Sequence, residues 1–171
     1  WDAGAVALLG SDPRQALAAV ESALTIDPFD PTSLMLKSHV LSERLGKLEQ
    51  AVGALDLLLS VQPDHVGGTA GRGVLLARLG QRDAALADAK RALELSQNSR
   101  NRFQVACIYA LTAVKDHPED RRVAIGLVAS AVYENPQLVS LAQGDADLAS
   151  LRSAVGFREL LDAAALTTTG K

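Results

Sequence analysis

A unit of about 34 residues repeats along this chain, and a period of that length restricts the fold more than any other feature of the sequence. The tripeptide Arg-Leu-Gly occurs at residues 44–46 and again, 34 residues later, at residues 78–80. An offset of 35 relates Ala51 to Ala16, and an offset of 39 relates the third copy to the fourth. The chain therefore divides into about four units, the fourth with an enlarged loop, at residues 1–28, 29–63, 64–97 and 98–136.

Each unit is expected to form two helices. The pairs Asp12-Pro13 and Asp30-Pro31 place a capping carboxylate before a proline at the first helical position. Gly46 and Gly80 lie where one helix must end and turn into the next. Hydrophobic residues make up 48% of the chain but aromatic residues only 4%, so alanine, leucine and valine must form the core. That composition suits closely packed helices, and the sequence predicts an all-α fold.

The repeated positions resemble those of the tetratricopeptide repeat (TPR). In that family a small residue lies in the first helix, a glycine at the turn, two alanines seven apart in the second helix, and a proline after it. The matching residues are, unit by unit, Gly4, Ala16, Ala23 and Pro28; Ser38, Gly46, Ala51 and Pro63; Gly73, Gly80, Ala85 and Ala92; and Cys107, Ala124, Ala131 and Pro136. The pattern departs at Leu58, in place of the second alanine, and at Gln97, in place of the proline. The resemblance covers residues 1–136 and implies a right-handed α-α superhelix, or solenoid, of about four helix pairs.

The period stops after Pro136, and residues 137–166 are expected to form capping helices. A cap is required because the last repeat would otherwise expose its apolar face. Two short helices fit, the first capped by Asp145 or Asp147, and their spacing resembles the ends of bacterial proteins that carry these repeats. Their apolar face consists of Leu148, Leu151, Phe157, Leu160 and Leu161. Residues 167–171 are expected to be a disordered tail.

Residues 65–80 contain five glycines, which raises the alternatives of a phosphate-binding loop or a helix. A Walker loop ends in Gly-Lys-Ser/Thr, whereas arginine and glycine follow Gly71. A dinucleotide-binding fingerprint needs a further glycine and a preceding strand, and neither is present. We interpret the stretch as the first helix of the third unit. Because Gly67, Gly68 and Gly71 weaken a helix, it either begins late, near Thr69, or stays frayed until something lies against it.

No reaction centre emerges from the remaining residues. The formal charge of −3 argues against nucleic acid as a partner. Cys107 with His117 would suggest a nucleophile and a base, but Cys107 falls at the small packing position of its unit. Asp145 and Asp147 could begin a calcium loop, yet the other ligands are missing and a helix cap fits better. The histidines have no metal-ligand spacing, so neither a metal nor a cofactor is expected, and no apolar run reaches the roughly 18 residues of a membrane span.

The first helices of the units should line the concave wall of such a superhelix, and partners should bind there. The offsets between the repeats assign the following residues to this wall: Met35, His39, Ser42, Glu43, Ala70, Val74, Ala77, Arg78, Asn101, Gln104 and Ile108. These residues are mostly small or apolar, so we expect an apolar anchor at Ala70, with Arg78 and His39 orienting polar groups. Family members that grip a C-terminal carboxylate use lysines and asparagines here. Only Asn101 resembles them, so no carboxylate clamp is expected.

The leading interpretation of function is a non-catalytic module that binds a protein or peptide segment and belongs to a larger protein. The alternative is a homodimer formed through apolar surface near Trp1, at an incomplete first unit. An enzyme or a nucleic-acid binder is less favoured. A further alternative is an anion or acidic-peptide contact, if the loop at residues 114–120 joins Arg100 and Arg102 to the arginines at 121 and 122. The compartment is left open, with the cytoplasm favoured.

Overall fold

A computed structural model describes residues 12–113 and 117–168, and every regular element in these ranges is helical. The predicted second to fourth units each form a pair of helices, and α2 (Pro13–Ile26) is the second helix of the first unit. The pairs are α3 (Pro31–His39), extended by η1 (Val40–Arg44), with α4 (Leu48–Val61); α5 (Val66–Arg78) with α6 (Arg82–Leu95); and α7 (Ser99–Thr112) with α8 (Pro118–Glu134). The C-terminal region consists of α9 (Leu138–Gly144), the 3₁₀ helix η2 (Ala146–Leu151) and α10 (Val155–Thr168).

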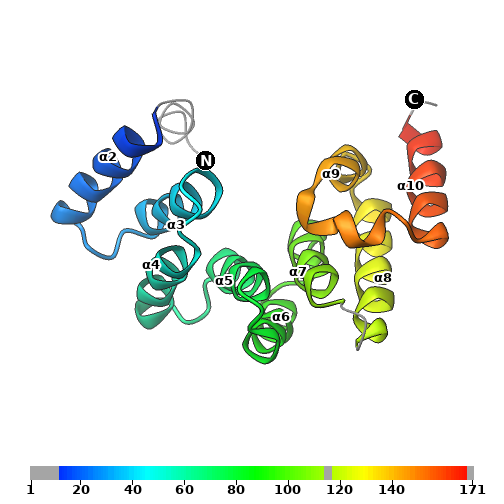
Figure 1. Cartoon of the computed structure of the whole chain (residues 1–171), viewed down its shortest axis with the longest axis horizontal. Coiled ribbons are helices and arrows are strands. Elements are labelled where there is room, and N and C mark those ends of the chain that lie inside the picture. The colour runs from blue at the N-terminus through cyan, green and yellow to red at the C-terminus, as the bar shows by residue number, and fades with distance from the viewer. Residues whose placement is uncertain (1–11, 114–116, 169–171) are drawn as a thin grey trace.

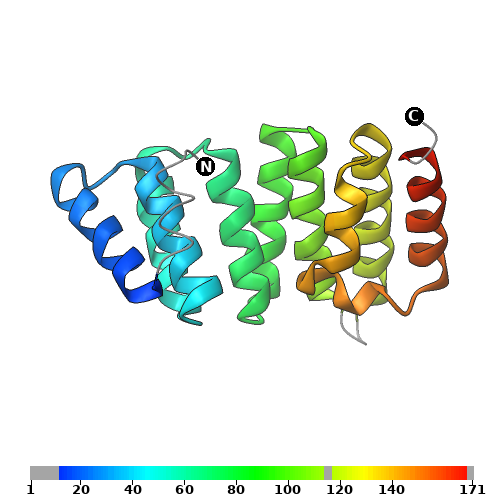
Figure 2. The same ribbon diagram turned by 90° about the horizontal axis from the view of Figure 1, so that it is seen from above.

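The helices stack side by side in a curved row (Figures 1 and 2). In Figure 1, α4, α6 and α8 follow the outer side of the curve, while α3, α5 and α7 lie along its inner side. The 3₁₀ helix η2 lies beside α7, α9 contacts α8 and α10, and α10 closes the C-terminal end of the row. The all-α fold of sequential helix pairs is therefore as predicted, and its inner helices form a concave face.

The predicted start and stop signals explain where these helices begin and end. The Asp12 carboxylate accepts backbone hydrogen bonds from Arg14 and Gln15, and the Asp30 carboxylate accepts one from Ser33 at 2.7 Å. Gly46 and Gly80 have φ angles of 65° and 75°, in the left-handed region that a side chain would disfavour. The turn between the two helices of a unit therefore depends on these glycines.

The inner helix of the second unit contains one more residue than that of the third. Eight positions separate Ser38 from Gly46, whereas seven separate Gly73 from Gly80. The extra residue is taken up in η1, which is a π-helical turn at the end of α3. Such wider turns are frequent at functional sites, and this one carries residues of the concave face.

Small residues allow the helices to approach closely. Most of the repeated alanines are buried: Ala16 is 1% exposed, and Ala51, Ala85, Ala92, Ala124 and Ala131 have no exposed surface. Ala23 of α2, which the repeat pattern also assigned to a helix contact, is exposed. A Cβ atom added to Gly73 would lie 2.6 Å from Ile108 Cδ1 and 3.1 Å from Asp88 Cβ, so α5 meets its neighbours at this glycine. The core follows the row of helices, with one apolar cluster at each interface and the largest between α7, α8 and the C-terminal helices.

Two buried acids on the outer helices are explained by arginine partners. Arg72 of α5 donates two hydrogen bonds, at 2.8 and 2.7 Å, to the Asp88 carboxylate of α6. Arg82 of α6 donates two, both at 3.0 Å, to the Asp120 carboxylate of α8. Paired two-bond contacts of this kind satisfy a buried carboxylate, so these acids hold neighbouring helices together.

The glycine-rich stretch is a helix, as predicted, and it begins at Val66 rather than near Thr69. His65 caps it, because its Nδ1 atom accepts a hydrogen bond from the Gly68 amide at 2.9 Å. A Cβ atom on Gly68 would lie 3.0 Å from Leu58 Cδ2, so this glycine also serves a close helix contact. The glycines at the start of α5 thus have a packing role that the sequence did not reveal.

The C-terminal region is helical, as expected, although its boundaries differ from the prediction. Asp145 caps η2 by accepting a hydrogen bond from the Asp147 amide at 2.9 Å. The additional helix α9 precedes it, and α10 continues to Thr168, beyond the expected start of the tail at residue 167. The rest of the predicted tail, like Gly4 and Trp1, lies outside the described residues. Among the helices that the structure describes, none has the length and apolarity needed to cross a bilayer.

Candidate functional site

The concave face contains a cavity of about 440 Å³, enclosed by α3, η1, α5, α7, α9 and η2. We call it the groove. Seven of the eleven residues predicted for the concave wall line it: Met35, His39, Ser42, Glu43, Val74, Arg78 and Gln104. These residues come from three successive units, so aligning the repeats in the sequence identified residues that lie close together in the structure.

The other four predicted residues do not line the groove. Ala70 and Ile108 have no exposed surface and Ala77 is buried, and all three belong to the core between α5, α6 and α7. Asn101 is buried as well, and its Nδ2 atom donates hydrogen bonds to the carbonyls of Ala92 and Ser96. Asn101 therefore secures α7 to the end of α6, and we do not retain these four residues in the proposed site.

The C-terminal region, which the sequence predicted only as a cap on the last repeat, also contributes residues to the groove. Leu138 and Leu141 of α9 and Asp147 of η2 line the groove opposite the second and third units. Phe103 and Cys107 of α7 lie between the two sides. Only contacts between distant parts of the chain bring these residues to the groove, and no local motif in the sequence indicates them.

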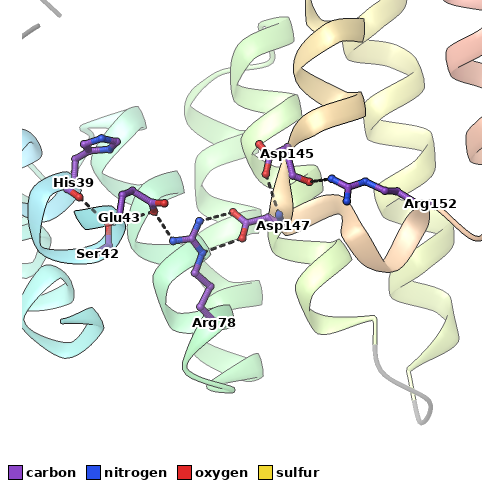
Figure 3. A network of polar contacts seen from close by, with 7 residues as sticks. All are labelled: His39, Ser42, Glu43, Arg78, Asp145, Asp147 and Arg152. Carbon is purple, nitrogen blue, oxygen red and sulfur yellow. Dashed lines mark hydrogen bonds and ion pairs between the residues drawn. The ribbon is translucent and has the colours of Figure 1, made fainter. Parts of the chain in front are cut away.

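Arg78 joins the two sides of the groove (Figure 3). Its Nε and Nη2 atoms each donate a hydrogen bond to the Asp147 carboxylate, both at 2.9 Å, and its Nη1 atom contacts Glu43. Arg78 of α5 thus connects η1 of the second unit to η2, whose Asp147 lies 69 residues beyond Arg78 in the chain. Because its donors are already paired, Arg78 fixes the groove rather than presenting a free charge.

Burial and neighbouring charges shift the pKa values of several groove residues. Burial alone would lower the pKa of Arg78, but its hydrogen bonds to Asp147 and Glu43 outweigh burial and raise it. Burial lowers the pKa of His39, which favours its neutral form. Burial, together with the charge of Asp147, raises the pKa of Asp145, and burial beside these two acids raises the pKa of the Cys107 thiol. The groove thus holds a region of negative charge that Arg78 only partly offsets.

The structure does not pair Cys107 with His117, the nucleophile and base considered from the sequence, and the proposed arginine cluster stays a prediction. His117 contacts Glu119 at 3.2 Å, whereas Cys107 lies beside Asp145 and Asp147. Arg102 forms an ion pair with Glu134, and the loop that would join it to the arginines at 121 and 122 includes residues 114–116, which lie outside the described ranges.

The chain is similar in structure to the TPR protein MamA. The crystal structure of MamA matches it with a TM-score of 0.67 and 14% identity, over 100% of this chain and 99% of the MamA chain. The MamA RS-1 ArsTM double mutant matches with a TM-score of 0.60 and 18% identity, over 93% of this chain and 88% of that one. No protein-family model matches the chain, and no curated protein matches its sequence. The similarity therefore shows a TPR-like fold, as the sequence predicts.

Proposed function

We propose that the chain is a non-catalytic interaction module and that its groove binds a segment of a partner protein. The lining of the groove is the observation that carries this proposal, because it combines apolar side chains with a few fixed polar groups. Sites that bind peptides have this composition. The TPR-like fold supports protein partners in general.

An apolar anchor on the partner would pack between the two walls of the groove. Met35 and Val74 are half-buried on one wall, and Leu141, which is 48% exposed, lies on the other. Exposed leucine beside partly covered apolar side chains gives a partner apolar surface to bury. The groove contact therefore depends on α9 as well as on the repeats.

Polar contacts with the partner would come from groove residues other than Arg78, which is already paired. Gln104 of α7 offers both a donor and an acceptor. Arg100 is exposed beside the groove, and within the described ranges its guanidinium forms no hydrogen bond or ion pair. Together with His39 they would set the orientation of the bound segment.

A selection of binding peptides from a displayed library tests the proposal. The blocked variant is Gln104→Trp, which places a large side chain in the groove at a half-exposed position. The matched control is Lys90→Trp, at an exposed position of α6 outside the groove. Selected peptides should bind the control as tightly as the wild type and bind Gln104→Trp at least about tenfold more weakly, a loss of about 1.4 kcal/mol. Equal binding to all three folded proteins would contradict a groove site.

Self-association is the second candidate function, and an apolar surface at the C-terminal end of the row of helices favours it. A cavity of about 820 Å³ lies between α8 and α10, lined by Val132, Pro136 and Leu160. Tyr133 beside it is 91% exposed. The residue first considered for a dimer, Trp1, lies outside the described ranges. Light scattering over a range of concentrations tests this candidate, because a dimer through this surface should dissociate in Tyr133→Lys, whereas a wild-type monomer at all concentrations would exclude it.

A further inference from the structure

Three potential metal ligands meet where η2 packs against α7. The Cys107 sulfur and one carboxylate oxygen from each of Asp145 and Asp147 all lie within 4.8 Å of one another. All three residues line the groove, so an ion can reach them from solvent. Zinc ligands at about 2.0–2.3 Å from the ion are separated from each other by distances of this order, so small movements would suffice.

Cys107 lies at the small packing position of its unit, and its thiol also faces these two acids. Cys107 is 4% exposed and is in no disulfide, and no hydrogen bond to its sulfur is found among the described residues. A buried cysteine elsewhere in the core would contact apolar groups alone. Cys107 packs in the apolar cluster between α7, α8 and the C-terminal helices, and its sulfur also lies near two carboxylate oxygens, which is an unfavourable place for a thiolate unless a cation lies between them.

The two carboxylates leave negative charge uncompensated. Asp147 pairs with Arg78, but Asp145 forms no ion pair in the part of the chain that the structure describes. Its carboxylate accepts one hydrogen bond, from the Asp147 amide. Since each carboxylate oxygen has two lone pairs, Asp147 can bind a cation and keep its hydrogen bonds to Arg78.

We propose that Cys107, Asp145 and Asp147 form a binding site for a divalent cation of the zinc type. A thiolate selects zinc over magnesium and calcium, which prefer oxygen ligands. Three protein ligands would leave the fourth tetrahedral position to water on the side of the groove. The ion would displace the thiol proton to solvent, and its two positive charges, together with that of Arg78, would balance the thiolate and the two carboxylates.

Contacts around the three ligands hold them in position. Ser150 of η2 donates a hydrogen bond at 2.8 Å to the carbonyl of Ala110, which fixes η2 to α7. Arg152 donates to the carbonyl of Asp145, also at 2.8 Å, and Arg78 holds Asp147. Supporting contacts of this kind orient metal ligands and raise affinity. The site joins the fourth unit to the C-terminal region, and the inference does not require that the groove binds a peptide.

Cobalt and zinc titrations of the reduced, metal-free protein test the site. Cobalt serves as the spectroscopic probe, because a thiolate ligand produces a charge-transfer band in the near ultraviolet. Calorimetry measures the affinity for zinc, and thermal unfolding with and without zinc measures whether the ion binds the native state. The test variants are Cys107→Ser and Asp145→Asn, and Asp162→Asn, at an exposed position of α10, is the matched control.

The wild type and Asp162→Asn should show the cobalt band and a higher unfolding temperature with zinc. Cys107→Ser should lose the band. Removing a supporting contact weakens metal binding about 10–100-fold, so loss of a ligand in Asp145→Asn should weaken zinc binding at least about tenfold. Asparagine can still cap η2, so this variant tests the site even if Cys107→Ser fails to fold. Absence of the cobalt band from the wild type, or unchanged zinc affinity in Asp145→Asn, would overturn the proposal.

Discussion

Replacing Gly73 by alanine measures how closely the inner helix α5 packs against its neighbours. The added Cβ atom would lie 2.6 Å from Ile108 Cδ1, 3.1 Å from Asp88 Cβ and 3.4 Å from the Ala85 carbonyl oxygen. The isoleucine methyl lies at the end of its side chain and can shift. Asp88 has less freedom, because Arg72 holds its carboxylate and the backbone of α6 holds its Cβ.

The expected effect combines two opposing contributions. Alanine favours a helix over glycine by about 0.5–1 kcal/mol, whereas overfilling a packed site costs about 1–3 kcal/mol. Gly53, inside α4, is the matched control because a Cβ atom there would meet nothing within 4 Å. Gly53→Ala should therefore stabilise the protein and Gly73→Ala should destabilise it. Their difference isolates the packing cost of about 1–3 kcal/mol, or roughly 2–12 °C in unfolding temperature.

Chemical and thermal unfolding of both variants supplies the measurement. A third variant, Ile108→Val, removes the atom nearest to the added Cβ. Combined with Gly73→Ala, it should cost less than the sum of the two single changes, because the first makes room for the second. If Gly73→Ala were as stable as Gly53→Ala, the close contact between α5, α6 and α7 would not exist and the assigned repeat register would be wrong.

Three further changes test the core, the groove and its charge by urea unfolding. Ala85→Asp should cost more than about 3 kcal/mol, because it buries an unpaired charge at a position with no exposed surface; wild-type stability would contradict the helix contact. Arg78→Met should cost about 1–3 kcal/mol by removing the partner of Asp147, whose side chain is only 11% exposed, whereas Arg91→Met, which breaks exposed ion pairs to Asp64 and Glu94, should cost less than about 1 kcal/mol; equal losses would argue against a structural role for Arg78. Burial raises the pKa of Asp145 in the folded state above its ordinary value of 3.8. The charged carboxylate therefore lowers the free energy of unfolding at pH 7. Below pH 3.8 the carboxyl group is protonated in both the folded and the unfolded state, so this effect disappears. In metal-free buffer, Asp145→Asn should therefore raise the free energy of unfolding at pH 7, with the gain vanishing below pH 3.8, and a loss at pH 7 would contradict this reasoning.

The fold could be predicted from the sequence because its signals are local and repeat. Asp30 caps a helix, and Gly80 takes the left-handed conformation at a turn, in the places that the repeat assigns to them. The helix α9 was missed because it follows the last recognisable period. Of the two alternatives for α5, the late start near Thr69 was wrong, because propensity counts each glycine as a cost, whereas Gly68 allows close packing against Leu58.

The residues of the groove could be predicted only in part from the sequence. A shared register position does not give a shared exposure: Met35 reaches the groove, whereas the equivalent Ala70 ends at its Cβ atom and is covered by its neighbours. The contact of Arg78 with Asp147, and the approach of Cys107 to the same acid, depend on how η2 packs against α7. Nothing in a local sequence window encodes that packing.

The chain contains one methionine, Met35, and this residue lines the groove. An NMR spectrum of the chain labelled at its methionine methyl group therefore reports on the groove through a single resonance. When a selected peptide is titrated in, binding in the groove should shift this resonance in a saturable way, with the same dissociation constant that calorimetry gives. A peptide that binds tightly while the Met35 resonance stays unmoved would contradict the central claim that partners bind on the concave face.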